Sequence, residues 1–285
     1  MPVNTTVSHI SPLLNYIPRS AWYEPTPQSD QALVAYPETS YHATNATVSG
    51  SASMTFSWWG QGELAKVYGG YRQWLGPYTV TLDGNATVHN GYAGDEERFD
   101  YVLFSAPDLA AGQHHLRITN SGHDPSRPVL DIGYLTFQSE SGAVDVIDHN
   151  SSLCRWTPKG ASVWQVDAVS HTTSLSSGAM GLNFTVRTGI SIYGLVDANS
   201  APFSVTLDSE TYPPLTPNNG IQGSLVNRST LLFVKTGLFG GPHTIWVENN
   251  PVSSVGNATA GATKMSISNM GVFGAVDRDA LPTPG

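Results

Sequence analysis

The chain has 285 residues, of which 40% are hydrophobic, and its formal net charge is −9. This hydrophobic content supports folded cores and excludes a disordered chain. Nucleic acid and anionic membranes are disfavoured as partners, because both select clusters of Lys and Arg, whereas the thirteen basic residues here are scattered. No apolar run is long enough to form a membrane span.

Apolar and polar residues alternate with a period of two through most of the chain, which is typical of half-buried strands. In residues 54–59, Met54, Phe56 and Trp58 share one face, and Trp59 lies on the other. Further strands are predicted at 78–82, 116–118, 182–186, 203–207 and 245–247, and turn signals such as Asp83-Gly84 lie between such segments. No amphipathic helix is expected. Many short strands with regular turns indicate an all-β fold of antiparallel sandwich or jelly-roll type.

The chain contains an internal repeat. Residues 78–83 (YTVTLD) return as 203–208 (FSVTLD), and 112–118 (GQHHLRI) return as 241–247 (GPHTIWV). Residues 67–69 match 192–194, and 130–132 match 265–267, so four matches occur in the same order at offsets of 125 to 135. We therefore predict two tandem domains, 1–142 and 143–285, which divide in the polar stretch that ends the first copy.

The order of motifs resembles a known family. An aromatic-rich opening (20–23 and 154–156) is followed in the first copy by residues 54–58, 67–69, 78–84 (YTVTLDG), 101–104, 112–120 (GQHHLRITN) and 130–137 (LDIGYLTF). This order is similar to the galactose-binding-domain-like β-sandwiches of carbohydrate-binding modules. It is most similar to the tandem copies in secreted or membrane-anchored fungal proteins.

The resemblance implies two antiparallel β-jelly rolls that bind a glycan without catalysis, with the sugar site in end loops or on a concave sheet face. Some members of such families carry a structural Ca²⁺, and no other cofactor is implied. The second copy departs from the pattern, since Ser266 replaces Asp131, so the first copy is expected to keep the ligand site. Two alternatives stay open: an extracellular interaction or accessory subunit that binds a secreted enzyme or itself, and a jelly-roll glycosidase or lyase.

The candidate ligand site in the first copy combines aromatic rings and hydrogen-bonding groups. Trp59 lies on the polar face of its strand, and Tyr71, Arg72 and Trp74 follow shortly after. Exposed aromatic rings can stack on a pyranose ring. The alternative is that these rings pack under loops or between the two domains.

Trp246 is the candidate in the second copy. It stands at the position of Arg117, on the outward face of its strand. It forms either a surface platform for a ligand or a contact with the first copy.

The acidic run 95–100 is a candidate Ca²⁺ site through Asp95, Glu96 and Asp100, because Ca²⁺ takes oxygen ligands. A solvated loop is the alternative, and a catalytic pair is disfavoured because glycosidase carboxylates face each other across a cleft. His114 and His243 occupy the same place in both copies, which favours histidines that bond their own turn over a metal site. No nucleophile or nucleotide-binding motif is present, and the chain is expected not to be an enzyme.

Seven Asn-x-Ser/Thr sequons predict a secreted glycoprotein: Asn4, Asn45, Asn85, Asn150, Asn183, Asn227 and Asn257. The single cysteine, Cys154, cannot form an internal disulfide and is expected to be a small buried hydrophobe. The first residues do not resemble a signal peptide, which taken literally indicates a cytosolic protein. Because of the sequons, a mature secreted chain or the ectodomain of a larger anchored protein is expected instead. The expected partner is a polysaccharide or other glycan, or else an extracellular protein.

Overall fold

A computed structural model of the chain describes residues 3–49, 51–62, 65–139, 144–160, 162–186, 188–218, 228–250 and 262–274. The first half contains the strands β1 (Val3–Ser8), β2 (Asn15–Ile17), β3 (Trp22–Tyr23), β4 (His42–Asn45), β5 (Ser53–Gly62), β6 (Ala65–Tyr71), β7 (Pro77–Leu82), β8 (Asn85–Asn90), β9 (Arg98–Ala106), β10 (Leu109–Asn120), β11 (Val129–Ile132) and β12 (Tyr134–Ser139). Its helical turns are η1 (Arg19–Ala21), η2 (Gln31–Ala35) and α1 (Ala46–Ser49).

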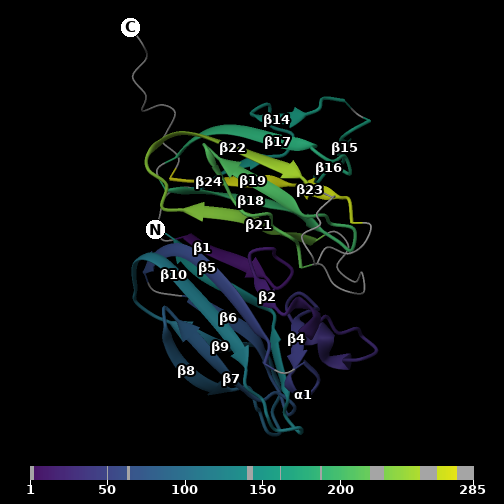
Figure 1. The fold of residues 1–285 in the computed structure, drawn as a ribbon, viewed down its shortest axis with the longest axis vertical. Coiled ribbons are helices and arrows are strands. Elements are labelled where there is room, and N and C mark those ends of the chain that lie inside the picture. Colours follow the sequence, from purple (N-terminus) through teal and green to yellow (C-terminus); the bar gives the residue numbers. More distant parts are fainter. Residues whose placement is uncertain are drawn as a thin grey trace.

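The second half contains a matching set of strands: β13 (Val144–Asp148), β14 (Cys154–Thr157), β15 (Gln165–Val166), β16 (His171–Thr173), β17 (Ala179–Val186), β18 (Gly189–Val196), β19 (Phe203–Leu207), β20 (Glu210–Thr211), β21 (Arg228–Thr236), β22 (Gly241–Asn249), β23 (Met265–Ile267) and β24 (Asn269–Phe273). Figure 1 shows the two halves stacked along the long axis of the molecule. The predicted all-β class is confirmed.

The same strand order occurs in both halves. The first half forms sheets β1-β12-β6-β9, β2-β5-β10-β7-β8 and β11-β4-β3, and the second forms β13-β24-β18-β21, β14-β17-β22-β19-β20 and β23-β16-β15. Each strand of the second half therefore corresponds to the strand numbered twelve lower. The strand sets divide between Ser139 and Val144, and the predicted boundary at residue 142 lies outside the described residues.

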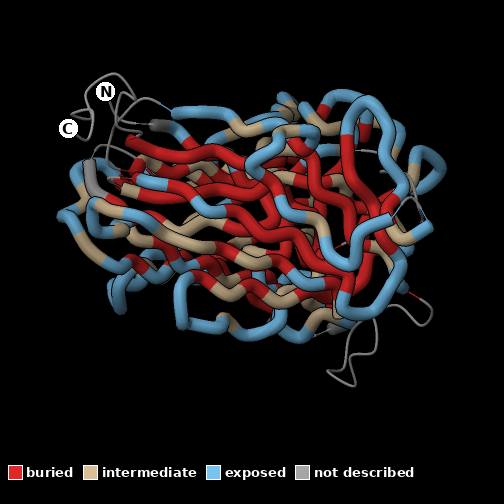
Figure 2. The backbone as a smooth tube through the Cα atoms, turned by 90° about the horizontal axis from the view of Figure 1, so that it is seen from above, coloured by how far each residue is buried: buried red, intermediate tan, exposed pale blue. Residues whose placement is uncertain are grey.

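Alternation of buried and partly exposed residues explains why these segments form half-buried strands. In β19, Phe203, Val205 and Leu207 are buried, and the two residues between them are half-buried. A tight turn between β7 and β8 places Asp83 and Gly84 at φ values of 50° and 86°, which suits a two-residue hairpin and an Asp-Gly pair. Buried segments run through the interior of the molecule, and exposed segments surround them (Figure 2).

The two halves are joined by exchanged side chains as well as by the chain itself. Ile10 of the first half belongs to the core of the second half, and Leu231 of the second half belongs to the core of the first. Ser11 Oγ donates to the carbonyl oxygen of Leu231 at 2.5 Å. β21 thus lies against β1 and β5 at the junction (Figure 1).

Candidate functional site

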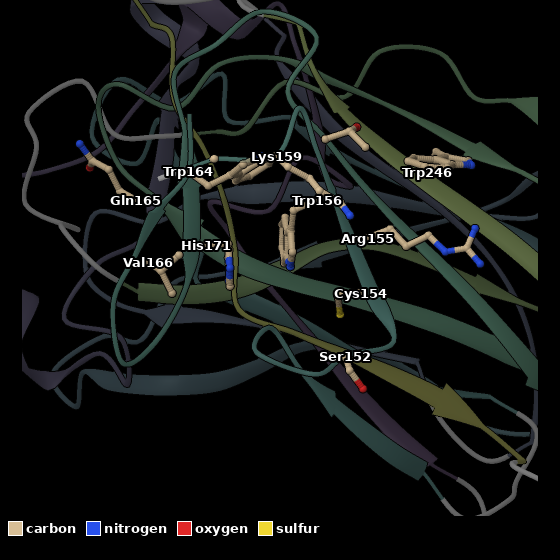
Figure 3. A pocket seen from close by; sticks show the side chains of 12 residues that line it. Ser152, Cys154, Arg155, Trp156, Lys159, Trp164, Gln165, Val166, His171 and Trp246 are labelled. Atoms are coloured by element: carbon tan, nitrogen blue, oxygen red, sulfur yellow. The ribbon is translucent and has the colours of Figure 1, made fainter. Parts of the chain in front are cut away.

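An aromatic groove opens on the side of the second half. It follows β14 and β15, which are edge strands of two different sheets, and its volume is about 1080 Å³. The residues that line it are Ser152, Cys154, Arg155, Trp156, Thr157, Lys159, Gly160, Trp164, Gln165, Val166, His171 and Trp246. Figure 3 shows Trp246 and Arg155 at one side of the groove, and Trp164, Gln165 and Val166 at the other. We call this site the β14 groove.

Three aromatic rings in mutual contact form the floor of the β14 groove. The rings of Trp156 and His171 lie 4.1 Å apart and nearly parallel, at 6°. Trp164 meets Trp156 edge-on at 4.7 Å. Burial, followed by the nearby His149 ring, lowers the pKa of His171, so this imidazole is neutral near pH 7. The floor is therefore apolar and uncharged.

Trp246 forms a wall of the groove, and a glycine determines how its ring lies. Trp246 in β22 pairs with Gly181 in β17, which pairs on its other side with Arg155 in β14. A Cβ atom on Gly181 would lie 2.6 to 2.8 Å from three carbons of the Trp246 ring. The ring therefore lies against the bare backbone at Gly181. Two positions were predicted for Trp246, a surface platform or a contact with the first copy. In the structure it lies on the surface of the second half and is partly exposed.

Polar groups surround the rings. Arg155, Lys159 and Gln165 are exposed side chains on the rim of the groove. Cys154 is buried, and burial followed by the charge of Asp148 raises the pKa of its thiol to about 11. Since the thiolate is the reactive form, this cysteine is inert near neutral pH, in agreement with the expectation of a small buried hydrophobe.

The first half contains the same ring cluster in corresponding positions. Tyr16 faces Met54 as Trp156 faces Met180, and its ring lies 4.7 Å from Trp22 and 4.8 Å from His42. His9 lies 4.9 Å from His42, as His149 lies 5.0 Å from His171. All four rings of the first half are buried, with at most 7% of any residue exposed. Trp156, in contrast, is partly exposed.

A segment of the second half covers the corresponding groove of the first half. Residues 214–218, which we call the strap, line a smaller cavity of about 560 Å³ together with Asn15, Tyr16 and Arg19. Asn218 Nδ2 donates to the carbonyl oxygens of Ser11 at 2.6 Å and Leu14 at 2.5 Å. Arg19 Nη2 donates to the carbonyl oxygen of Pro217 at 2.7 Å. The β14 groove is thus the more open of two related sites.

The predicted aromatic site of the first half is not assembled. The ring of Trp59 lies against Gly237 of the second half, and its carbonyl oxygen accepts from Thr236 Oγ1. Tyr71 instead stacks on Tyr101 at 4.6 Å. β5 and β6 belong to different sheets, so Trp59 and Tyr71 lie apart. Trp59 takes the alternative position between the two halves.

Arg72 was expected to contact a ligand, but the structure corrects this because its guanidinium is inside the fold. The side chain is 2% exposed and forms a bidentate pair with Asp30, at 2.6 and 3.0 Å. Its Nε lies 3.3 Å from Glu97 Oε2. Trp74 covers the guanidinium at 3.8 Å from ring centroid to Cζ. Arg72 and Trp74 therefore serve the packing of this region.

The acidic run does not converge on one point. Asp95 and Glu96 are exposed, with Glu96 3.9 Å from Arg98, and Asp100 accepts from the Tyr134 hydroxyl at 2.5 Å. Within the part of the chain that the structure describes, no group of three or more His, Cys, Asp or Glu side chains could hold a metal ion. A Ca²⁺ at Asp95, Glu96 and Asp100 stays a prediction, and the geometry is that of the alternative, a solvated loop.

The paired histidines have the structural contacts that the repeat predicted. His114 Nδ1 lies 2.7 Å from Asp83 Oδ2, and its Nε2 lies 2.8 Å from the carbonyl oxygen of Ala110. His243 repeats this with Asp208 at 2.8 Å and with Phe239 at 2.9 Å. Asp131, the residue on which the first copy was expected to keep its site, is also internal: it accepts from Gly70 N and from the Tyr36 hydroxyl.

The sequons within the described residues lie at the surface. Asn4, Asn85, Asn150 and Asn183 are exposed, and Asn45 is half-buried. Asn227 and Asn257 lie outside the described residues. In the described ranges, no helix has the length and apolar character needed to cross a membrane.

Sequence reasoning identified only Trp246 among the residues of the β14 groove as a ligand candidate. Trp156 was noted in the aromatic-rich opening, but Trp164 and His171 were not considered. The available signal was the repeat itself: Trp22 and Trp164, and likewise His42 and His171, occupy matching strand positions.

No protein-family model and no curated protein matches the chain. Among solved structures, a xanthan lyase from Paenibacillus is 11% identical over 97% of this chain and 25% of its own, with a TM-score of 0.29. The tandem CBM22 domains of Paenibacillus barcinonensis Xyn10C are 10% identical over 95% of this chain and 100% of theirs, with a TM-score of 0.25. The plant receptor-like kinase FER is 8% identical over 97% of this chain and 88% of its own, with a TM-score of 0.26.

The chain thus spans a quarter of the lyase chain that it matches. Similarity at this level assigns neither a ligand nor a reaction to this chain. The fungal character of the resemblance stays a prediction.

Proposed function

We propose that this chain is a non-catalytic glycan-binding protein whose site is the β14 groove. The observation that carries the proposal is an open groove with a tryptophan floor, a tryptophan wall and a polar rim, formed by Trp156, Trp164, Trp246, Arg155 and Gln165. Sugar rings present apolar faces to aromatic rings and hydroxyl groups to polar side chains, which is the combination found here.

The lining supports binding rather than hydrolysis. Glycoside hydrolysis by the usual route needs two carboxyl groups that flank the scissile bond. No Asp or Glu occurs among the described residues that line the groove. The exposed sequons at Asn4, Asn85, Asn150 and Asn183 support an extracellular location, either as a secreted protein or as part of a larger anchored one.

A second candidate function is the binding of an extracellular protein segment. The strap favours it, because a stretch of polypeptide lies against the corresponding groove of the first half and is hydrogen-bonded there. On this alternative the chain would be an accessory subunit, and the β14 groove would bind an extended stretch of its partner.

Retention on insoluble polysaccharides tests the proposal. We expect the wild-type protein to be retained on at least one polymer and Trp246→Ala to lose about tenfold or more in affinity, since loss of a stacked ring removes roughly 1.4 kcal/mol or more. Trp74→Ala is the matched control, because it removes a partly exposed tryptophan from the first half. Equal retention of Trp246→Ala, or loss only in Trp74→Ala, would exclude the β14 groove. Absence of retention on every polymer together with a co-purifying protein would favour the second candidate.

A further inference from the structure

The charge of the β14 groove differs from that of the whole chain. The chain carries 22 Asp and Glu residues against 13 Lys and Arg. The described residues that line the groove nevertheless include two cations, Arg155 and Lys159, and no carboxylate. His171 contributes no charge, because burial lowers its pKa. The lining itself is therefore positive, and the nearby carboxylates that act on Cys154 and His171, those of Asp148 and Asp167, lie outside it.

Neither cation is used by the fold. In the described ranges, four other basic side chains form ion pairs with carboxylates, including Arg72 with Asp30 at 2.6 Å and Lys264 with Asp197 at 2.6 Å; Arg98 and Arg127 are the other two. Within the described residues, Arg155 and Lys159 form no ion pair, and both are exposed. Their positive charges are thus available to a ligand in the groove.

The first half shows what a cation at one of these positions does. Arg19 lies two residues after the end of β2, and Lys159 lies two residues after the end of β14, the corresponding strand. Arg19 donates to an oxygen of the strap, the carbonyl of Pro217, at 2.7 Å. In the first half, the cation at this position therefore contacts a backbone oxygen of the strap.

Arg155 lies within reach of a sugar stacked on Trp246. The two residues lie two strands apart, with Gly181 between them, so their backbones are separated by roughly 10 Å. Because Gly181 has no side chain, the Trp246 ring lies over this intervening strand, which is the neighbour of Arg155. Arginine pairs with carboxylates in a bidentate manner and with a fixed geometry.

We propose that the ligand of the β14 groove is an acidic glycan that contains uronic acid residues. The sugar rings stack on Trp246 and Trp156, and the uronate carboxylates pair with Arg155 and Lys159. This inference rests on the proposed glycan-binding function and adds the chemical class of the ligand.

The test compares each acidic polymer with its own neutral form. Retention of the intact protein is measured on immobilised polygalacturonate, alginate and glucuronoxylan, and on the carboxyl-reduced form of each. We expect retention on at least one uronate polymer, about tenfold or more weaker retention on its reduced form, and weakening by added salt. Because the protein itself has a net charge of −9, retention on a polyanion is not explained by overall charge.

Variants locate the effect. The double variant Arg155→Gln, Lys159→Gln should lose about tenfold or more in affinity for the uronate polymer, and its loss on the reduced form should be clearly smaller. Lys66→Gln, Arg98→Gln removes two positive charges from the first half and should bind as the wild type does. Equal retention on acidic and reduced forms, or on neutral polysaccharides alone, would overturn the acidic ligand but leave glycan binding intact. Retention on no polysaccharide would overturn both.

Discussion

At the scale of single residues, a glycine on the neighbouring strand allows a large ring to lie flat on the sheet. Trp246 lies over Gly181, whereas its counterpart Arg117 pairs with Thr55, whose side chain occupies that space. The sequence predicted the outward face of Trp246 from the repeat. It could not show that Gly181 lies underneath, because the register of two strands more than sixty residues apart is fixed only by folding.

Arg72 is a residue whose sequence context suggests a role that the fold does not give it. An arginine between Tyr71 and Trp74 looks like a ligand contact in the sequence. Its partners Asp30 and Glu97 come from distant parts of the chain, and together they hold it inside the fold. Only the tertiary structure tells such a buried ion pair from an exposed binding group.

Asp131 gives a prediction on pH dependence. Burial is the main cause that raises the pKa of its carboxyl to about 6, against the hydrogen bonds from Tyr36 and Gly70. This pKa is higher in the folded state than in the unfolded chain, so ionisation of Asp131 opposes folding. The free energy of unfolding therefore falls as the pH rises from about 4 to above 6. The loss is on the order of 3 kcal/mol.

The variant Asp131→Asn removes this titration while it keeps an amide oxygen for the Gly70 N–H. We expect the free energy of unfolding of the variant, relative to the wild type, to increase between pH 4 and pH 7. Urea denaturation at a series of pH values measures this difference. A difference that is constant over this range would contradict the assignment.

At the scale of elements, the candidate site is built from the shortest strands of the fold. Its floor comes from β14, β16 and the residue before β15, which are strands of four, three and two residues. Alternation is not detectable over such lengths, so the sequence predicted the long strands and missed these. The three rings of Trp156, Trp164 and His171 therefore appear together only in the folded chain.

The strap gives a prediction at this scale. Asn218 is 5% exposed, and its amide group satisfies the carbonyl oxygens of Ser11 and Leu14. Asn218→Ala leaves both oxygens without this donor, which costs about 1 to 3 kcal/mol of unfolding free energy. Urea denaturation measures this loss of unfolding free energy. Asn199→Ala is the control, since Asn199 is exposed and its hydrogen bonds with residues 263 and 264 use its backbone oxygen, which the substitution keeps. A loss no larger than that of the control would show that the strap does not hold the two halves together.

At the scale of the whole molecule, the repeat predicts two copies of one strand arrangement, and the two sets of sheets have the same order. The sequence could not predict that the copies differ in accessibility. That difference arises at the junction, where residues 214–218 of one half line the groove of the other and leave a smaller cavity there. It also supports our proposal of a site in the second copy, in place of the site that Asp131 led us to expect in the first.

We propose that, within the described residues, the ligand site lies in the second half, and that the chain binds one ligand there. Isothermal titration with an oligosaccharide from a polymer that retains the protein tests this most directly. We predict one binding site per chain, with the heat of binding abolished or strongly reduced by Trp246→Ala and preserved in Trp74→Ala. Two equivalent sites per chain, or a binding curve that Trp246→Ala leaves unchanged, would contradict it.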